Sequence, residues 1–156
     1  MSQARSLARQ RALQALYQWD ITGQSLADIE QQFMEADEPD REDDEPIMKG
    51  VESGYFKALL HEIPAGLQEL DQLTSPLLDR PITQLDPVER TILRIGAYEL
   101  KQRVDIPYRV VINEAVELAK LFGAEQGHKY INGILDKLAQ SVREIEVKAA
   151  ASRPRR

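Results

Sequence analysis

The chain has 156 residues and no cysteine, which excludes disulfides, thiolate metal sites and a cysteine nucleophile. Hydrophobic residues make up 42% and charged residues 29%, a balance typical of a globular domain and unlike that of a disordered chain. No segment approaches the roughly 18 consecutive apolar residues of a membrane span, and the first residues lack the apolar run of a signal peptide. We therefore expect a cytoplasmic protein with no membrane association.

The net charge of −6 comes mostly from one short run. Residues 35–45 hold eight acids and one arginine, whereas the rest of the chain has 18 acids and 19 bases. So many like charges repel one another, so we expect a solvated acidic loop over residues 35–46. The first 19 residues carry three arginines and no acid, and the last residues are basic too. An anionic partner could therefore bind elsewhere on the molecule, and we expect residues 146–156 to be a disordered basic tail.

The N-terminal half predicts four helices. Residues 4–21 place apolar side chains three and four positions apart, as on one helical face, and Gly23 ends the pattern. Ser25 is a candidate N-cap for a second helix. A third helix is predicted over residues 47–61. A fourth is expected to begin at Pro64 and end near Pro76, before a connection that contains further prolines.

The C-terminal half has the clearest helix signals. Asp86, Pro87 and Glu89 stand at the N-cap, N1 and N3 positions of a fifth helix, in which Gly96 predicts the close approach of another backbone. A sixth helix should follow Pro107 and end before a glycine. A seventh should run from about residue 127 to 145. No alternation typical of strands occurs, so the sequence predicts an all-α protein of about seven helices.

Candidate catalytic residues are few. The two histidines, His61 and His128, stand far apart in the sequence, and no phosphate-binding glycine loop or metalloprotease motif occurs. Glu114 and Glu117 lie three residues apart and could share a metal, but a surface ion pair between Glu117 and Lys120 is the better interpretation. We predict that the chain is not an enzyme and binds no metal or cofactor.

A nucleic-acid site has more support. Arg5 and Arg9 share one helical face, and Tyr17 lies two turns further on. Lys129 and Tyr130 stand at the start of the last helix, where backbone N–H groups favour a phosphate. Arginine neutralises phosphates, and exposed aromatic rings stack on unpaired bases. The alternatives are that Tyr17 packs in the core, that Tyr130 is partly buried against the preceding helix, and that the arginines only aid solubility.

Three stretches resemble a known family. They are RALQALYQWDITGQ (11–24), LDPVERTILRIGAYEL (85–100) and DIPYRVVINEAVELAKLFGAEQGHKYINGILDKLA (105–139). They are similar to bacterial transcription antitermination factors of the NusB family, and the likeness covers about residues 4–140. The resemblance implies one all-helical RNA-binding domain over residues 1–140. It would contain two packed three-helix bundles, about 4–75 and 86–140, that share a helix.

The resemblance also implies partners and site residues. The chain would bind the boxA element of ribosomal RNA leader transcripts as single-stranded RNA, together with the small-subunit ribosomal protein NusE. That complex would join other Nus factors on RNA polymerase, without catalysis or a cofactor. The implied RNA-binding residues are Arg5, Arg9, Tyr17, Tyr108, Gln126, Lys129 and Tyr130. The implied partner interface contains Glu89, with Arg90 and Arg94 as neighbours by helical spacing.

Two questions stay open at this point. One alternative is a helical protein–protein docking module with no RNA binding of its own, whose arginines contact an acidic protein surface. The other is self-association, because some relatives form homodimers. The RNA-binding interpretation depends on one expectation, that the first helix and the turn before the last helix meet as a single surface.

Overall fold

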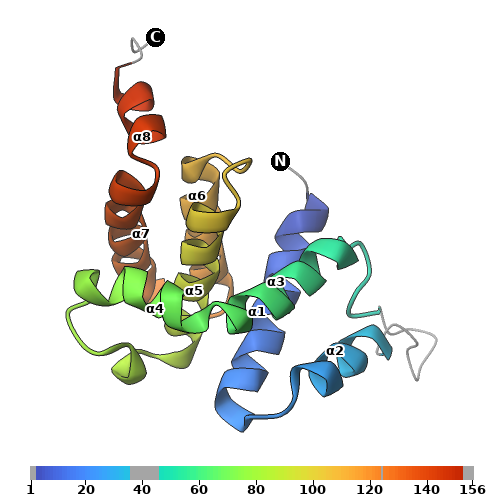
Figure 1. Ribbon diagram of the computed structural model, residues 1–156. Helices are drawn as coiled ribbons and strands as arrows, with labels where there is room; N and C mark the ends of the chain where they lie inside the picture. Colours follow the sequence, from blue (N-terminus) through green and yellow to red (C-terminus); the bar gives the residue numbers. More distant parts are fainter. Residues whose placement is uncertain (1–2, 36–45, 124, 153–156) are drawn as a thin grey trace. The chain divides into compact units, whose positions relative to one another are not determined.

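The computed structural model describes residues 3–35, 46–123 and 125–152, and within these ranges it contains eight α-helices, short 3-10 turns and no strand (Figure 1). The predicted all-α class is confirmed, with one helix more than expected. The chain divides into two compact units, Met1–Gly66 and Leu67–Arg156. Among the described residues no helix is long and apolar enough to cross a membrane. Most of the predicted acidic loop, residues 36–45, lies outside the described residues.

The first unit packs three helices, α1 (Gln3–Thr22), α2 (Leu26–Glu35) and α3 (Ser53–Ala65), each in contact with the other two. Three buried alanines of α1 let α3 approach closely, namely Ala8, Ala12 and Ala15. Phe33 of α2 stacks on Phe56 of α3 with ring centroids 5.7 Å apart. The predicted cap of α2 is confirmed, since Asp28 N donates to Ser25 Oγ at 3.1 Å.

The third helix begins and ends later than predicted. Residues 46–50 form a turn in which Lys49 N donates to Pro46 O, and Gly50 adopts a φ of +75° that a helix does not allow. Glu52 then precedes the first turn of α3. Pro64, which the sequence placed at a helix start, lies in the last turn of α3, where its missing N–H costs only one helical hydrogen bond.

The second unit is built on α5 (Pro87–Gln102), which contacts α4 (Leu67–Thr74), α6 (Tyr108–Leu121) and α7 (His128–Val142). The predicted start of α5 is confirmed, because the Asp86 carboxylate accepts from the backbone N–H groups of Val88 and Glu89 at 2.9 and 3.3 Å. The units divide after Gly66 and not near residue 75, because α4 packs on α5 and α7.

A glycine lets α7 pack closely on α5. A Cβ added to Gly96 would lie 2.7 Å from Leu135 Cδ1, closer than carbon atoms pack. Leu135 is fully buried. The sequence predicted the approach of a backbone at Gly96, whereas the neighbour is the side chain of a leucine on α7. Position 96 therefore needs glycine to leave room for the Leu135 side chain and not for a neighbouring backbone.

The last predicted helix is interrupted. The structure ends α7 at Val142 and begins α8 (Glu144–Ala151) after a break at Arg143, whose φ of −124° is not helical (Figure 1). The guanidinium of Arg143 is buried and donates to backbone carbonyls at the end of α5. Residues 146–151, predicted to belong to a disordered tail, are therefore helical, and residues 153–156 of that tail lie outside the described residues.

Candidate nucleic-acid interface

Two arginines of α1 lie on the ring of one tyrosine of α3. The guanidinium carbon of Arg5 is 5.1 Å from the centroid of Tyr55, and that of Arg9 is 5.4 Å from it. Both distances are within the range of a cation–π interaction. Arg5 Nε also lies 3.4 Å from Glu52 Oε2. Tyr55 is buried, so the ring is a fixed support for both cations.

The two arginines differ in what they can reach. The side chain of Arg5 is 31% exposed, so an anion can approach its guanidinium. Arg9 is 1% exposed, so it lies in the interior where the sequence placed it on the surface. The guanidinium of Arg5 is therefore accessible to a phosphate group. Arg9 instead packs against Tyr55, because it lies on the same inward-facing side of α1 as the buried alanines.

The rest of α1 presents an aromatic side chain. Tyr17 is 39% exposed and Ile21, one turn later, is exposed too. The alternative in which Tyr17 belongs to the core is therefore not what the structure shows. Arg11, the third arginine of this segment, donates from Nε to the carbonyl oxygen of Ile47 at 2.6 Å and from its terminal nitrogen to Gln14. Arg11 thus holds α1 against the turn that precedes α3.

The second candidate region is the first turn of α7. Gln126 and Lys129 are exposed, and Tyr130 is half-buried. The Tyr130 hydroxyl donates to Asp79 Oδ1 at 2.9 Å and accepts from Asp79 N at 3.2 Å. The alternative of partial burial therefore describes Tyr130 better than a fully exposed ring does. Its hydroxyl joins α7 to a connection 51 residues earlier in the chain.

The Asp79 carboxylate also forms an ion pair with Arg80, the next residue in the chain. Arg80 donates from Nε to Asp79 Oδ1 at 3.0 Å and from one terminal nitrogen to Oδ2 at 3.3 Å. The hydrogen bond from Arg80, followed by that from Tyr130, lowers the pKa of Asp79 below its ordinary value of 3.8. The pKa of Arg80 is raised by the same pair. Burial of the Tyr130 ring, more than its bond to Asp79, raises the pKa of its hydroxyl.

Glu89 lies directly against the loop that precedes α7. Its carboxylate fills the space that a Cβ on Gly127 would need. The pKa of Glu89 is raised above its ordinary value of 4.5, first by burial and then by the nearby charge of Asp86, while Arg80 opposes the shift. The resemblance implied that Glu89 belongs to a partner interface. The structure places it within the second unit, at the turn that carries Lys129.

This shift predicts a pH-dependent contribution of Glu89 to stability. Between the pKa of the unfolded chain, near 4.5, and the higher pKa of the folded chain, the folded state binds more protons. The free energy of unfolding therefore falls as the pH rises through that window, and the loss is complete above it. Glu89→Gln should remove this fall, so that the variant gains stability relative to the parent as the pH rises from 4 to 8. Urea midpoints across that range check it.

A charge-matched control for the titration is Glu69→Gln, which removes an exposed carboxylate of α4. The difference in midpoint between parent and Glu89→Gln should change with pH more than the difference for Glu69→Gln does. Equal pH profiles for the two variants would contradict the assignment of the effect to Glu89.

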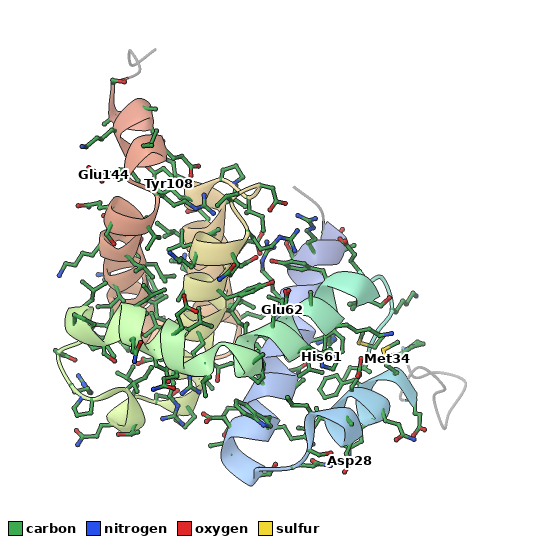
Figure 2. All side chains as sticks on the ribbon, viewed as in Figure 1. Asp28, Met34, His61, Glu62, Tyr108 and Glu144 are labelled. Carbon is green, nitrogen blue, oxygen red and sulfur yellow. The ribbon has the colours of Figure 1, made fainter. Side chains whose placement is uncertain are left out.

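Three other predicted site residues have internal contacts. Tyr108 begins α6 and is 8% exposed, with its hydroxyl accepting from Arg109 Nε at 3.1 Å (Figure 2). A terminal nitrogen of Arg90 lies 3.3 to 3.4 Å from the carbonyl oxygens of residues 82, 83 and 85. Arg94 makes a two-bond pair with Asp71 at 3.0 Å. These side chains hold the second unit together, and little of Tyr108 or Arg94 is left for a partner to touch.

Catalytic or metal-binding groups do not come together among the described residues. His61 of α3 contacts Glu30 of α2 at 3.1 Å on the surface of the first unit (Figure 2), whereas His128 belongs to the second unit. No group of three or more His, Asp or Glu side chains in the described part of the chain could hold a metal ion. The pair of Glu117 and Lys120 is present on α6 at 3.8 Å, as predicted.

The sequence did not identify Glu52, Tyr55, Asp79 or Arg80. Tyr55 lies within the third predicted helix, and helical spacing cannot show that two cations from another helix lie on its ring. For Arg80 a signal was present. It is the single Lys or Arg between Lys57 and Arg90, and it lies in the predicted connection that contains further prolines. The two candidate regions belong to different units, and that they form one surface stays a prediction.

Comparison with known proteins identifies the family. A family model described as the NusB family matches residues 6–140. Transcription antitermination protein NusB of Alkalilimnicola ehrlichii is 54% identical over 98% of this chain and 90% of its own length. The protein of the same name from Nitrosococcus oceani is 52% identical over 99% of this chain and 98% of its own length.

A solved structure agrees. The fold is similar to that of T. maritima NusB, with a TM-score of 0.73 and 28% identity over 95% of this chain and 99% of that one. These proteins are antitermination factors and not enzymes, which confirms the prediction that the chain catalyses no reaction. The chain belongs to the NusB family of transcription antitermination factors.

Proposed function

We propose that this chain binds the boxA element of ribosomal RNA leader transcripts as a heterodimer with ribosomal protein NusE. The complex then joins the other Nus factors on RNA polymerase and suppresses premature termination. The observation that carries the proposal is the family match over residues 6–140, which includes every candidate RNA-binding residue except Arg5. Arg5, Tyr17, Gln126 and Lys129 support it, because each has side-chain surface that RNA can reach.

The charge of the chain explains why a partner is needed. Phosphate neutralisation supplies most non-specific RNA affinity, and a chain of net charge −6 provides little of it. A basic ribosomal protein adds positive surface beside the same RNA. Because each protein then supplies part of one site, the affinity of the pair exceeds that of either protein alone. Unpaired bases would be read by stacking, for which Tyr17 is available.

The test of the proposal is a filter-binding titration with a boxA oligomer and a scrambled RNA, with and without NusE. Preference for boxA that strengthens when NusE is added supports it. Equal binding of both RNAs by the heterodimer contradicts it and favours the docking module. The molecular mass in solution with and without NusE and boxA, measured in parallel, reports stoichiometry and any homodimer.

We expect Arg5→Ala to weaken binding of boxA by the heterodimer and to reduce the salt dependence. One lost phosphate contact on a single strand lowers the slope of log K against log salt by about 0.7. Lys57→Ala, which removes an exposed cation of α3 in the same unit, is the matched control and should leave the slope unchanged. If both variants change the slope equally, Arg5 acts only through net charge and not through a contact.

A further inference from the structure

We infer that Arg80 is a further RNA-contacting residue and that Tyr130 positions it through Asp79. The inference rests on the proposed function, because it adds Arg80 to the RNA surface and gives Tyr130 a positioning role there. Its basis is a chain of hydrogen bonds within the second unit. The Tyr130 hydroxyl binds both the backbone N–H and the carboxylate of Asp79, and the same carboxylate takes two bonds from Arg80.

Arg80 has the geometry of an arginine prepared for a phosphate. Its side chain is 53% exposed. Nε and one terminal nitrogen face Asp79, so the other terminal nitrogen is the part of the fork that a phosphate oxygen can meet. An exposed arginine normally loses side-chain entropy when it binds. Here the pair with Asp79 has already restricted the guanidinium, which lowers that cost.

Tyr130 fixes the position of this arginine relative to α7. Tyr130 follows Lys129 directly in the first turn of α7, so the bonds from its hydroxyl to Asp79 bring the connection that carries Arg80 to the same turn. Arg80 also lies near enough to Tyr130 and Glu89 for their charges to affect its pKa. A strand of RNA that meets Lys129 would therefore pass Arg80.

The local charge favours a specific contact over a general attraction. Asp79 and Glu89 lie near Arg80, and Asp86 lies near Glu89, so this region is not a positive patch. Non-specific binding there should be weak, because nearby carboxylates repel most phosphates. One correctly placed phosphate can still bind the open side of the guanidinium. Contacts of this kind set the register of a nucleic acid on a protein.

The experiment measures binding of a boxA oligomer to the heterodimer with NusE for Arg80→Ala, Tyr130→Phe and the double variant. Arg80→Ala should weaken binding about three- to tenfold, the range of one exposed charge-assisted contact, and lower the salt slope by about 0.7. Tyr130→Phe keeps the ring and the net charge but loses the bonds to Asp79. It should weaken binding in the parent and have little further effect once Arg80 is alanine.

Lys148→Ala is the matched control, because Lys148 is an exposed cation of the same unit paired with Glu144 at 2.6 Å. It should leave affinity and slope unchanged. Equal losses from Tyr130→Phe in both backgrounds would overturn the inference, because the hydroxyl would then act without Arg80. So would an unchanged slope for Arg80→Ala, or a loss of NusE binding measured without RNA, which would make Arg80 a protein contact.

The same data separate this inference from the proposed function. If the parent heterodimer does not prefer boxA, the proposed function fails. If the parent prefers boxA and Arg5→Ala weakens binding while Arg80→Ala does not, only the inference about Arg80 fails. Circular dichroism of each variant, at the temperature of the titration, verifies that the helices are intact.

Discussion

Replacing Arg143 by alanine should lower the free energy of unfolding by about 3–5 kcal/mol, the cost of breaking a buried charged network by removing one partner. Arg143 is 5% exposed and makes five hydrogen bonds of 2.6 to 3.1 Å. Its acceptors are the carbonyl oxygens of Glu99, Leu100, Arg103 and Ile106 and the carboxylate of Glu146. Without the guanidinium, the end of α5 keeps buried carbonyl groups that no longer have this donor.

Urea unfolding followed by circular dichroism at neutral pH measures this loss. Arg143→Lys separates charge from geometry, because an ammonium group keeps the charge but cannot reach acceptors on several sides. We expect the lysine variant to lose less than the alanine variant and more than Lys148→Ala, which removes an exposed ion pair of α8. A loss below about 1 kcal/mol for Arg143→Ala would mean that water replaces the guanidinium at no great cost.

Local signals in the sequence predicted much of the fold correctly. The start of α5 at Asp86 and Pro87 needs only a short side chain and a missing N–H at fixed positions, so neighbouring residues are enough to identify it. The cap at Ser25 is of the same kind. Gly123, expected at the end of α6, has a φ of +85°, as a glycine that ends a helix often does.

Features that depend on distant parts of the chain were not predictable in this way. The apolar spacing of the last helix continues through Arg143, so nothing local indicates a break there. The break occurs where the guanidinium reaches carbonyl groups 37 to 44 residues earlier in the chain. The start of α3 at Ser53 also depends on a distant part of the chain, because Glu52 N donates to Ala4 O of α1 at 3.1 Å.

The candidate site residues also fall into two groups, those that could be predicted from the sequence and those whose environment depends on distant parts of the chain. Sequence and resemblance identified Arg5, Tyr17, Gln126 and Lys129, and the structure leaves all four accessible. The sequence and the resemblance could not show that Arg9 is buried, because its spacing from Arg5 fits a shared helical face whether that face is exposed or packed. The difference depends on Tyr55, which lies 46 residues after Arg9 and receives both guanidinium groups.

Tyr55→Ala should therefore affect both stability and RNA binding. Truncating a buried aromatic ring costs about 3–5 kcal/mol, and Tyr55 is 3% exposed. The substitution also removes the ring on which Arg5 and Arg9 lie. Each lost cation–π contact lowers the free energy of unfolding by about a further 0.5–2 kcal/mol. Tyr55→Phe keeps the ring face, so we expect it to retain most of the stability. Urea unfolding of the two variants measures the difference.

The effect on RNA follows from the position of Arg5. Without the ring, Arg5 keeps its pair with Glu52 but loses the support that holds the guanidinium, so it must be ordered again when a phosphate binds. Under conditions where both variants are folded, Tyr55→Ala should weaken boxA binding by the heterodimer, and Tyr55→Phe should restore it. In an Arg5→Ala background the two variants should bind alike, because the arginine that the ring supports is absent. A difference that persists there would show that Tyr55 affects RNA by another route.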